Sequence, residues 1–189
     1  YFGLGNSLQT AQAGGAGGPP SGGWVELART TLGSAGAAID VTSLPDKRYY
    51  MVLSDIFATG SSIDYTLRFN GDSGSNYAYR KSEDGAADAT STSTVFMLPG
   101  DSNNANGMFS VGYASNLSSK EKLFMSHTVH GLATGAGTAP KRFEHIGKHV
   151  QTSNPISSMK MTDFGTSSYD TNSEVVVLGW DPADTHTTN

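Results

Sequence analysis

Apolar and polar residues alternate along most of this chain, and Gly, Pro, Asn, Asp and Ser interrupt the alternation at short intervals. In the segment Ser62–Asn70 every second residue is large and apolar: Ile63, Tyr65, Leu67 and Phe69. Successive side chains of a β-strand point to opposite faces, so this pattern predicts a strand with one face on a hydrophobic core and with Asp64 and Arg68 on the other. No stretch carries the apolar stripe of an amphipathic helix, and we expect less than about 10% helix.

The same pattern predicts strands throughout residues 24–180. They are Trp24–Arg29, Ala38–Val41, Asn76–Lys81, Thr94–Leu98, Met108–Tyr113, Leu123–His130, Arg142–Val150, Ile156–Thr162, Glu174–Trp180 and Lys47–Phe57. The last of these is apolar at both parities, which predicts a central strand covered on both faces. Many short strands separated by turns indicate one all-β domain over residues 24–180, an antiparallel β-sandwich with a jelly-roll-like topology.

The first 23 residues differ in composition from the rest. Residues 11–23 are mostly Gly and Ala, which predicts a flexible linker because such residues offer little surface to bury. Large apolar residues precede this linker: Tyr1, Phe2, Leu4 and Leu8. We therefore expect residues 1–23 to form an extended, Gly-rich N-terminal arm whose apolar segment mediates contacts between subunits. Residues 181–189 are expected to form a polar C-terminal tail.

Charge and composition exclude several classes of partner. Lys and Arg number 12 against 17 Asp and Glu, a net charge of −5, and no long basic run exists, so nucleic-acid binding is not expected. No apolar run reaches the roughly 18–20 residues that span a bilayer, and the first residues lack the pattern of a secretion signal, so no membrane association is expected. The sequence contains no Cys, which excludes disulfides and thiolate metal ligands.

The histidines are natural candidates for metal ligands. His127 and His130 lie three apart on a predicted strand and therefore face opposite sides. His145 and His149 share a face, but roughly 13 Å of extended chain separates them, which is too far for one ion. We expect solvated or singly hydrogen-bonded histidines, and no bound metal or other cofactor.

Two loops are rich in oxygen ligands: Asn70–Asn76 and Asp101–Asn106. Neither has the spacing or the terminal Glu of an EF-hand calcium loop. Asn-Gly-Asp between two strands is typical of a hairpin, because these residues tolerate positive φ. We therefore interpret the first loop as a hairpin turn.

The sequence contains no Gly-x-Ser-x-Gly nucleophile motif and no Cys nucleophile, and we expect no enzymatic activity. Asn116-Leu117-Ser118 matches the N-glycosylation sequon. Several tyrosines fall in the first two-thirds of the chain: Tyr49, Tyr50, Tyr65, Tyr77, Tyr79 and Tyr113. Exposure of these rings on one face would indicate a carbohydrate-binding module, whereas burial would indicate core residues.

One stretch carries a resemblance to a known group of proteins. The segment Arg68–Tyr79 reads RFNGDSGSNYAY, and it follows Asp40–Pro45, which reads DVTSLP, and the apolar segment Tyr50–Ser54. This arrangement resembles small virion proteins of tailed bacteriophages, in which an RFN-D-G-NY hairpin follows a D-V-x-x-L-P turn and a long apolar strand. The similarity covers about residues 24–90, and the remainder matches only as continued β pattern.

The resemblance implies a jelly-roll-like, non-enzymatic structural protein located in the virion, which decorates or cements the capsid or belongs to the tail. Its implied partners are other copies of the chain and virion proteins such as the major capsid protein. The alternative is a carbohydrate- or receptor-binding module of a tail fibre, which would bind a host-surface glycan. A depolymerase-type enzyme would instead need a cleft with two close carboxylates.

Overall fold

The computed structural model describes residues 23–60, 63–102, 106–165 and 167–182. Tyr1, Phe2, Leu4 and Leu8 of the expected arm lie outside the described residues, as does the rest of residues 1–22 and residues 183–189 of the expected tail. Within the described part the chain is all-β. No helix is present there, so these residues contain no candidate for a membrane-spanning helix.

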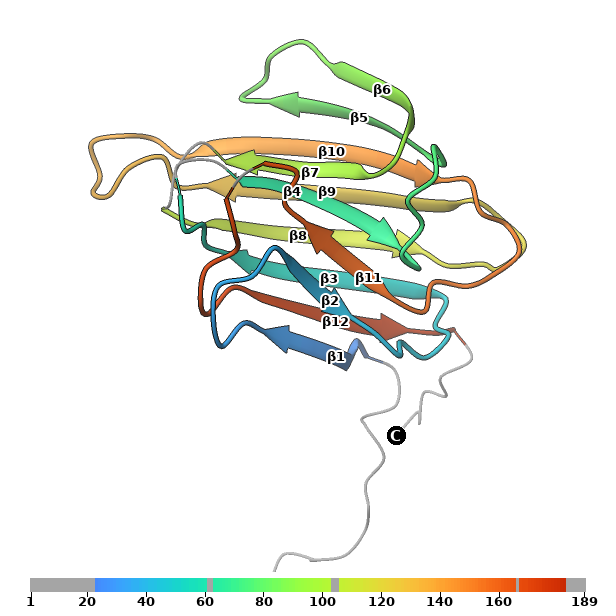
Figure 1. Cartoon of the computed structure of the whole chain (residues 1–189). Coiled ribbons are helices and arrows are strands. Elements are labelled where there is room, and N and C mark those ends of the chain that lie inside the picture. The colour runs from blue at the N-terminus through green and yellow to red at the C-terminus, as the bar shows by residue number, and fades with distance from the viewer. Residues whose placement is uncertain (1–22, 61–62, 103–105, 166, 183–189) are drawn as a thin grey trace, which may run out of the picture.

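In the described residues, twelve strands form two antiparallel sheets (Figure 1). The larger sheet has the order β1-β12-β3-β8-β9-β10-β5-β6, and the smaller sheet has the order β2-β11-β4-β7. The strands are β1 (Val25–Thr31), β2 (Ala38–Val41), β3 (Tyr49–Ile56), β4 (Ile63–Phe69), β5 (Tyr77–Glu83), β6 (Ala89–Thr94), β7 (Met97–Ser102), β8 (Met108–Ser115), β9 (Lys122–His130), β10 (Lys141–His149), β11 (Met159–Thr162) and β12 (Glu174–Trp180).

The chain changes sheet at most of its connections. Only the steps from β5 to β6, from β8 to β9 and from β9 to β10 stay within one sheet. The strand pairs are nested along the sequence, since β5 pairs with β6, β4 with β7, β3 with β8, β2 with β11 and β1 with β12. A long antiparallel ribbon folded over into two layers has this pairing. Strands β9 and β10 extend the larger sheet between β8 and β5.

Nearly all the predicted strands are confirmed, and β2 has its predicted bounds. The prediction over Thr94–Leu98 is wrong, because Val95 and Phe96 form the bend that separates β6 from β7. Strand β6 itself has the sequence ATSTST, which carries no large apolar residue and therefore no alternation. The segment is a strand because it pairs with β5 at the edge of the larger sheet.

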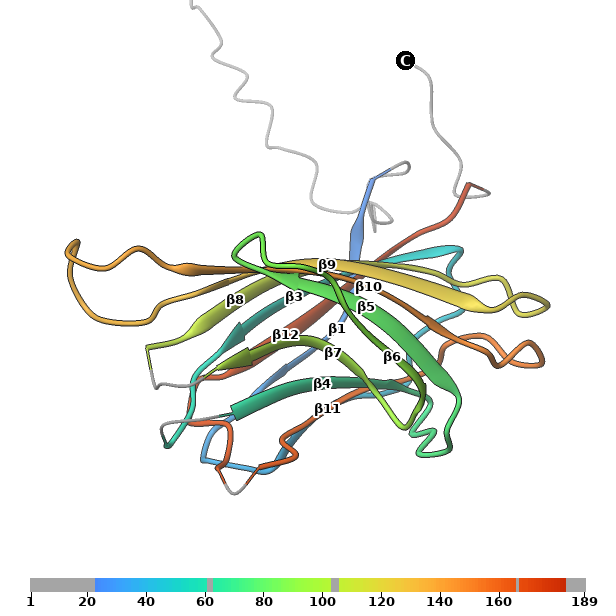
Figure 2. The same cartoon turned by 90° about the horizontal axis from the view of Figure 1, so that it is seen from above.

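The hydrophobic core lies between the two sheets, which pack face to face in a β-sandwich-like arrangement (Figure 2). The predicted inner face of β4 is confirmed, since four of its side chains are at most 1% exposed: Ile63, Tyr65, Leu67 and Phe69. Asp64 and Arg68 have the opposite parity, and both are half-buried. The Arg68 side chain donates from Nε to the Val95 carbonyl oxygen at 2.8 Å.

The prediction of a hairpin at Asn-Gly-Asp is wrong, because β4 pairs with β7 and β11 in the smaller sheet whereas β5 pairs with β6 and β10 in the larger sheet. The local turn itself is present: Asn70 has a φ of 56° and Gly71 a φ of 66°, and the Asp72 N–H donates to the Phe69 carbonyl oxygen at 3.0 Å. The Asn70 side chain also ties this turn to the segment before β11. Its Oδ1 accepts from the Ser157 N–H at 2.7 Å, and its Nδ2 donates to the Pro155 carbonyl oxygen at 2.8 Å.

The carboxylate of Asp72 is occupied by protein donors. It accepts hydrogen bonds from the Gly74 N–H at 2.8 Å and from the Asn76 amide at 2.9 Å, and it lies 2.8 Å from Nε2 of His149 on β10. Burial raises the pKa of Asp72, but the hydrogen bonds from His149, Gly74 and Asn76 outweigh burial and leave the pKa below its ordinary value. Through His149, Asp72 therefore joins the turn after β4 to the larger sheet.

Asn116 connects three loops at one end of the sandwich. Its Nδ2 donates to Asp46 Oδ1 and to the Lys47 carbonyl oxygen, both at 2.9 Å, and to the Tyr50 hydroxyl at 3.2 Å. Its Oδ1 accepts from the Ile156 N–H at 2.7 Å. The Asn116 residue is only 3% exposed, so the sequon is not accessible to a glycosyltransferase in the folded domain.

Substitution Asn116→Ala is expected to lower the free energy of unfolding by about 2 kcal/mol, because it leaves the buried Ile156 N–H and several acceptors without a partner. Urea denaturation measures the change. Asn154→Ala is the matched control, since Asn154 is exposed in a nearby loop and its loss should change stability by less than about 0.5 kcal/mol. Equal effects of the two substitutions would contradict the role of Asn116.

Candidate functional site

The larger sheet has one face on the core and one face that no other described element covers (Figure 2). On β8 and β9, many of the buried inward residues are small or polar: Ser110, Gly112, Ala114, Ser126 and Thr128. At Gly112 a Cβ atom would lie 2.5 Å from the Phe124 ring, so the interior has no room there for a larger residue. Met108 and Phe124 point into the core, and the other large apolar side chains of these strands stand on the uncovered face.

Strand β3 shows that apolar residues at both parities do not mean burial on both faces. Tyr50, Val52 and Ile56 are buried in the core, whereas Met51 and Leu53 lie on the uncovered face and are only half-buried. The prediction that Lys47–Phe57 is covered on both sides is therefore wrong. The smaller sheet packs on one face of the larger sheet, and nothing among the described residues covers the second face.

Six large apolar residues on β8, β9 and β10 form what we term the outer apolar face. Each is between 44% and 57% exposed: Phe109, Tyr113, Leu123, Met125, Val129 and Ile146. The strand register joins them, because Tyr113 lies directly opposite Met125, and Met125 lies directly opposite Ile146. Directly opposed side chains on neighbouring strands contact one another, so the row forms one continuous apolar surface.

Aromatic side chains border this surface near the start of β1 and the end of β12. Val25 pairs with Gly179, which brings Trp24 and Trp180 to the same end of the sheet. The Trp24 ring lies 6.1 Å from the Tyr113 ring, and the Trp180 ring stacks on the Tyr49 ring at 5.4 Å between centroids. We refer to Trp24, Tyr49, Tyr113 and Trp180 as the aromatic rim.

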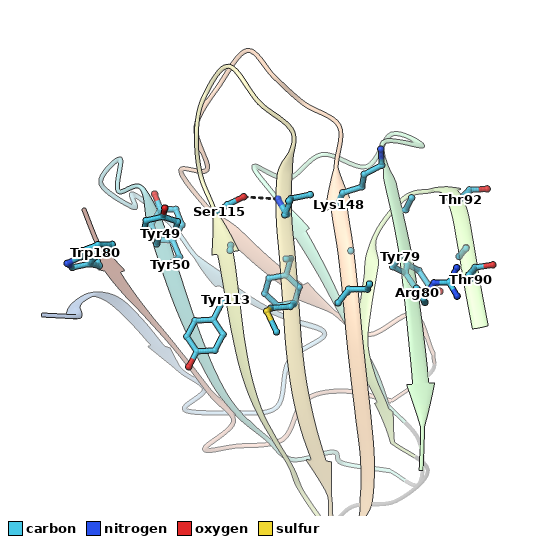
Figure 3. Close-up of a pocket in the computed structure, with 18 of the residues that line it drawn as sticks. Tyr49, Tyr50, Tyr79, Arg80, Thr90, Thr92, Tyr113, Ser115, Lys148 and Trp180 are labelled. Atoms are coloured by element: carbon cyan, nitrogen blue, oxygen red, sulfur yellow. Dashed lines mark hydrogen bonds between the residues drawn. The ribbon is translucent and has the colours of Figure 1, made fainter. Parts of the chain in front are cut away.

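The aromatic rim and part of the outer apolar face line a shallow depression of about 860 Å³, whereas Phe109 and Val129 of that face are not among the lining residues. In Figure 3, Tyr113 lies between the pair Tyr49 and Trp180 on one side and Arg80 and Thr90 on the other. Leu123, Met125 and Ile146 contribute to the lining, which is mostly apolar. The volume is within the range of ligand pockets, but the site is an open surface, as in a protein contact.

Arg80 and Lys148 carry the charge of the depression, since no carboxylate is among the residues that line it. Both cations already have acidic partners: Arg80 forms an ion pair with Asp88 at 2.8 Å, and Lys148 forms one with Glu121 at 3.0 Å. An incoming group therefore meets an apolar surface with paired cations at its border. The arrangement favours an uncharged, apolar ligand.

Carboxylates gather at the far end of the same sheet face. Asp55 on β3 lies directly opposite Glu174 on β12, and burial, together with the negative charge of Glu174, raises the pKa of Asp55. Glu174 is bound to Arg29 at 2.9 Å, and Arg29 also contacts Glu26 at 2.8 Å. All three acids lie outside the depression, and Glu26 and Glu174 are held in an ion-pair network with Arg29.

The histidines lie where the strand parities predict. His127 is exposed and His130 is buried, so they face opposite sides of β9. His149 is buried and bound to Asp72, as described above. In the part of the chain that the structure describes, no three metal-binding side chains come together, and the loop around residues 103–105 lies outside that part.

His145 contradicts the expectation of a solvated or hydrogen-bonded histidine. It is 1% exposed, and neither ring nitrogen has a hydrogen-bond partner among the described residues. The rings of Tyr79 and Phe124 lie 5.4 Å and 5.9 Å away. Burial, with a contribution from the positive charge of Lys81, lowers the pKa of His145 to about 3.

The tyrosines divide between the two alternatives that the sequence leaves open. Tyr50, Tyr65 and Tyr77 are buried core residues with hydrogen-bonded hydroxyls. Tyr113 is 44% exposed, and Tyr49 is half-buried on the aromatic rim. The outer apolar face is not among the features predicted from the sequence, although the large apolar residues at the outward parity of β8 and β9 are the signal for it.

Comparison of the chain with protein-family models, with curated proteins and with solved structures finds no match.

Proposed function

We propose that this chain is a non-enzymatic structural protein of a tailed-bacteriophage virion, and that it assembles through the outer apolar face. The proposal places it on the particle surface, as a capsid decoration or cement protein or as a tail-associated protein. Its partners would be other copies of itself and virion proteins such as the major capsid protein. The resemblance of the sequence Arg68–Tyr79 to phage virion proteins supports the virion, and the outer apolar face supports assembly.

The observation that carries the proposal is the placement of the large apolar residues on β8 to β10. A strand that served folding alone would bury Phe109, Leu123 and Ile146 and expose its serines and threonines. Here the three apolar residues are exposed while serines and threonine of β8 and β9 are buried, and the exposed apolar residues are contiguous. Contiguous exposed apolar surface of this kind is typical of protein contact sites.

The nested strand pairs support a jelly roll as the finer description of the fold. A jelly roll is a long antiparallel ribbon rolled into two sheets, and the pairs from β5–β6 outward to β1–β12 follow that scheme. The hairpin of β9 and β10 would be an insertion that widens one sheet. Such a widened sheet has an uncovered face available for assembly.

The alternative function is a carbohydrate- or receptor-binding module of a tail fibre. The aromatic rim favours it, because Trp24 and Tyr113 expose ring surface that sugars stack on. The floor of the depression opposes it, since Leu123, Met125 and Ile146 offer no hydrogen-bonding side chain to a hydroxyl group. Assembly therefore accounts for more of the surface than sugar binding does.

The double substitution Leu123→Glu and Ile146→Glu tests the proposal. Two carboxylates on the outer apolar face are expected to weaken self-association or attachment to the particle by about 100-fold or more, because burying unpaired charge is costly. Sedimentation velocity measures self-association, and co-sedimentation with purified particles measures attachment. Both side chains are more than half exposed, so the isolated domain should keep its melting temperature.

Thr42→Glu is the matched control, since it adds a carboxylate at an exposed residue that follows β2 of the smaller sheet. It should leave assembly unchanged. Assembly that survives the double substitution would overturn the proposal. Binding of a glycan library that Trp24→Ala abolishes, with no assembly in any assay, would establish the alternative.

A further inference from the structure

We propose that the segment Tyr1–Leu8 of a neighbouring copy covers the outer apolar face, so that subunits are joined by exchanged N-terminal segments. This inference rests on the proposed assembly function and names the occupant of its surface. Three features support it. The described chain begins beside the depression, the segment Tyr1–Leu8 and the depression are both apolar, and residues 9–23 form a long link between them.

The described chain begins beside the surface that this inference concerns. Trp24 is a member of the aromatic rim, with its ring 6.1 Å from the ring of Tyr113, and it lines the depression. The residues that precede Trp24 in the sequence are therefore attached at the border of the depression. A segment attached there has a high effective concentration at the faces of subunits packed around this one.

The chemistry of the segment matches that of the surface. Tyr1, Phe2, Leu4 and Leu8 are large and apolar, and residues 1–23 contain no Asp, Glu, Lys, Arg or His. The depression is mostly apolar, and its cations Arg80 and Lys148 are already paired with acidic residues. An uncharged apolar segment therefore meets no unpaired charged side chain among those that line the depression.

The length of the connection points to a neighbouring copy. Residues 9–23 separate the apolar segment from Trp24 and can span up to about 50 Å when extended, at roughly 3.3 Å per residue. Trp24 already lies on the face of its own copy, and a reversal of the chain onto that face needs only a few residues. The long, Gly-rich connection fits a path to the next subunit.

Cysteine cross-linking tests the exchange, and the absence of native Cys makes it unambiguous. One full-length chain carries Leu4→Cys, a second carries Ile146→Cys, and the two are mixed and mildly oxidised under conditions in which the native chain associates. We expect a disulfide-linked heterodimer, with at least a tenfold higher yield than in a mixture of Leu4→Cys with Asp40→Cys. Asp40 is exposed on the outward side of β2 in the smaller sheet, which makes it the matched control.

A single chain with both Leu4→Cys and Ile146→Cys distinguishes exchange from folding back. Linked multimers support exchange, whereas an internally closed monomer shows that the segment covers the face of its own copy and overturns the inference. A heterodimer yield equal to that of the Asp40→Cys control also overturns it. If association then still depends on Leu123 and Ile146, the assembly function stands and another occupant covers the face. If the native chain neither associates nor attaches to particles, the assembly function itself fails.

Discussion

The protein is expected to lose about 3 kcal/mol of its free energy of unfolding between pH 7 and pH 4 through one buried histidine. Burial, with a contribution from Lys81, lowers the pKa of His145 from its ordinary 6.5 to about 3 in the folded domain. Between these values the unfolded chain binds a proton that the folded chain excludes. The stability from neutral His145 is complete above pH 6.5 and falls by about 1.4 kcal/mol per pH unit toward pH 3.

Urea denaturation at a series of pH values, on the native chain and on His145→Leu, measures this effect. The variant is expected to remove about 3 kcal/mol of the difference in stability between pH 7 and pH 4, whatever its stability at pH 7. His127→Gln is the control, because His127 is exposed on the neighbouring strand, and it should keep the acid dependence of the native chain. An unchanged pH profile in His145→Leu would show that the folded domain accommodates the proton.

A further loss of stability is expected in stronger acid from a second group. The pKa of Asp72 is lowered below 3.8, because hydrogen bonds from His149, Gly74 and Asn76 outweigh its burial. The stability from the ionised carboxylate is therefore present above pH 3.8 and is lost as the pH falls through the lowered pKa. The window between pH 6.5 and pH 4 consequently reports on His145 rather than on Asp72.

The strands could be predicted because each depends mainly on local alternation. Residues 63–69 alternate strictly, and β4 has the predicted inner face. Strand β6 could not be predicted in this way, because an edge strand of Ala, Ser and Thr is held by its pairing with β5 and buries little apolar surface. The Asn-Gly turn was predictable because its positive φ values are a local property of these residues, whereas the expected hairpin was not, because the partner strands of β4 and β5 are distant in the sequence.

The candidate site could not be predicted from alternation alone, because burial of a face depends on the other sheet. In β3, Met51 and Leu53 have the apolar character of core residues, and they stay uncovered because the smaller sheet packs on the other face of β3. In β8 the pattern is inverted, with Ser110 inside and Phe109 outside. A strand with large apolar residues on one face and serine or glycine on the other is therefore a signal for a binding face. The signal can be used only when it is known which of the two faces points to the core.

Loss of a leucine side chain is expected to cost much more stability in the core than on the outer apolar face. Leu67→Ala on β4 is expected to lower the free energy of unfolding by about 2–5 kcal/mol, because Leu67 is fully buried between the sheets and its loss leaves a cavity. Leu123→Ala is the matched control, with the same chemistry at a position that is 57% exposed on the outer apolar face. Its effect on the isolated domain should be below about 1 kcal/mol.

The same pair of substitutions separates folding from assembly. Leu67→Ala removes apolar volume from the core and leaves the outer face intact, so at temperatures where it is folded it should associate as the native chain does. Leu123→Ala should instead weaken association while the melting temperature of the isolated domain is nearly unchanged. Denaturation and sedimentation velocity on both variants provide the two readouts. A large loss of stability in Leu123→Ala would mean that this side of the sheet is packed within the domain itself, and the outer apolar face would then not be free to bind a partner.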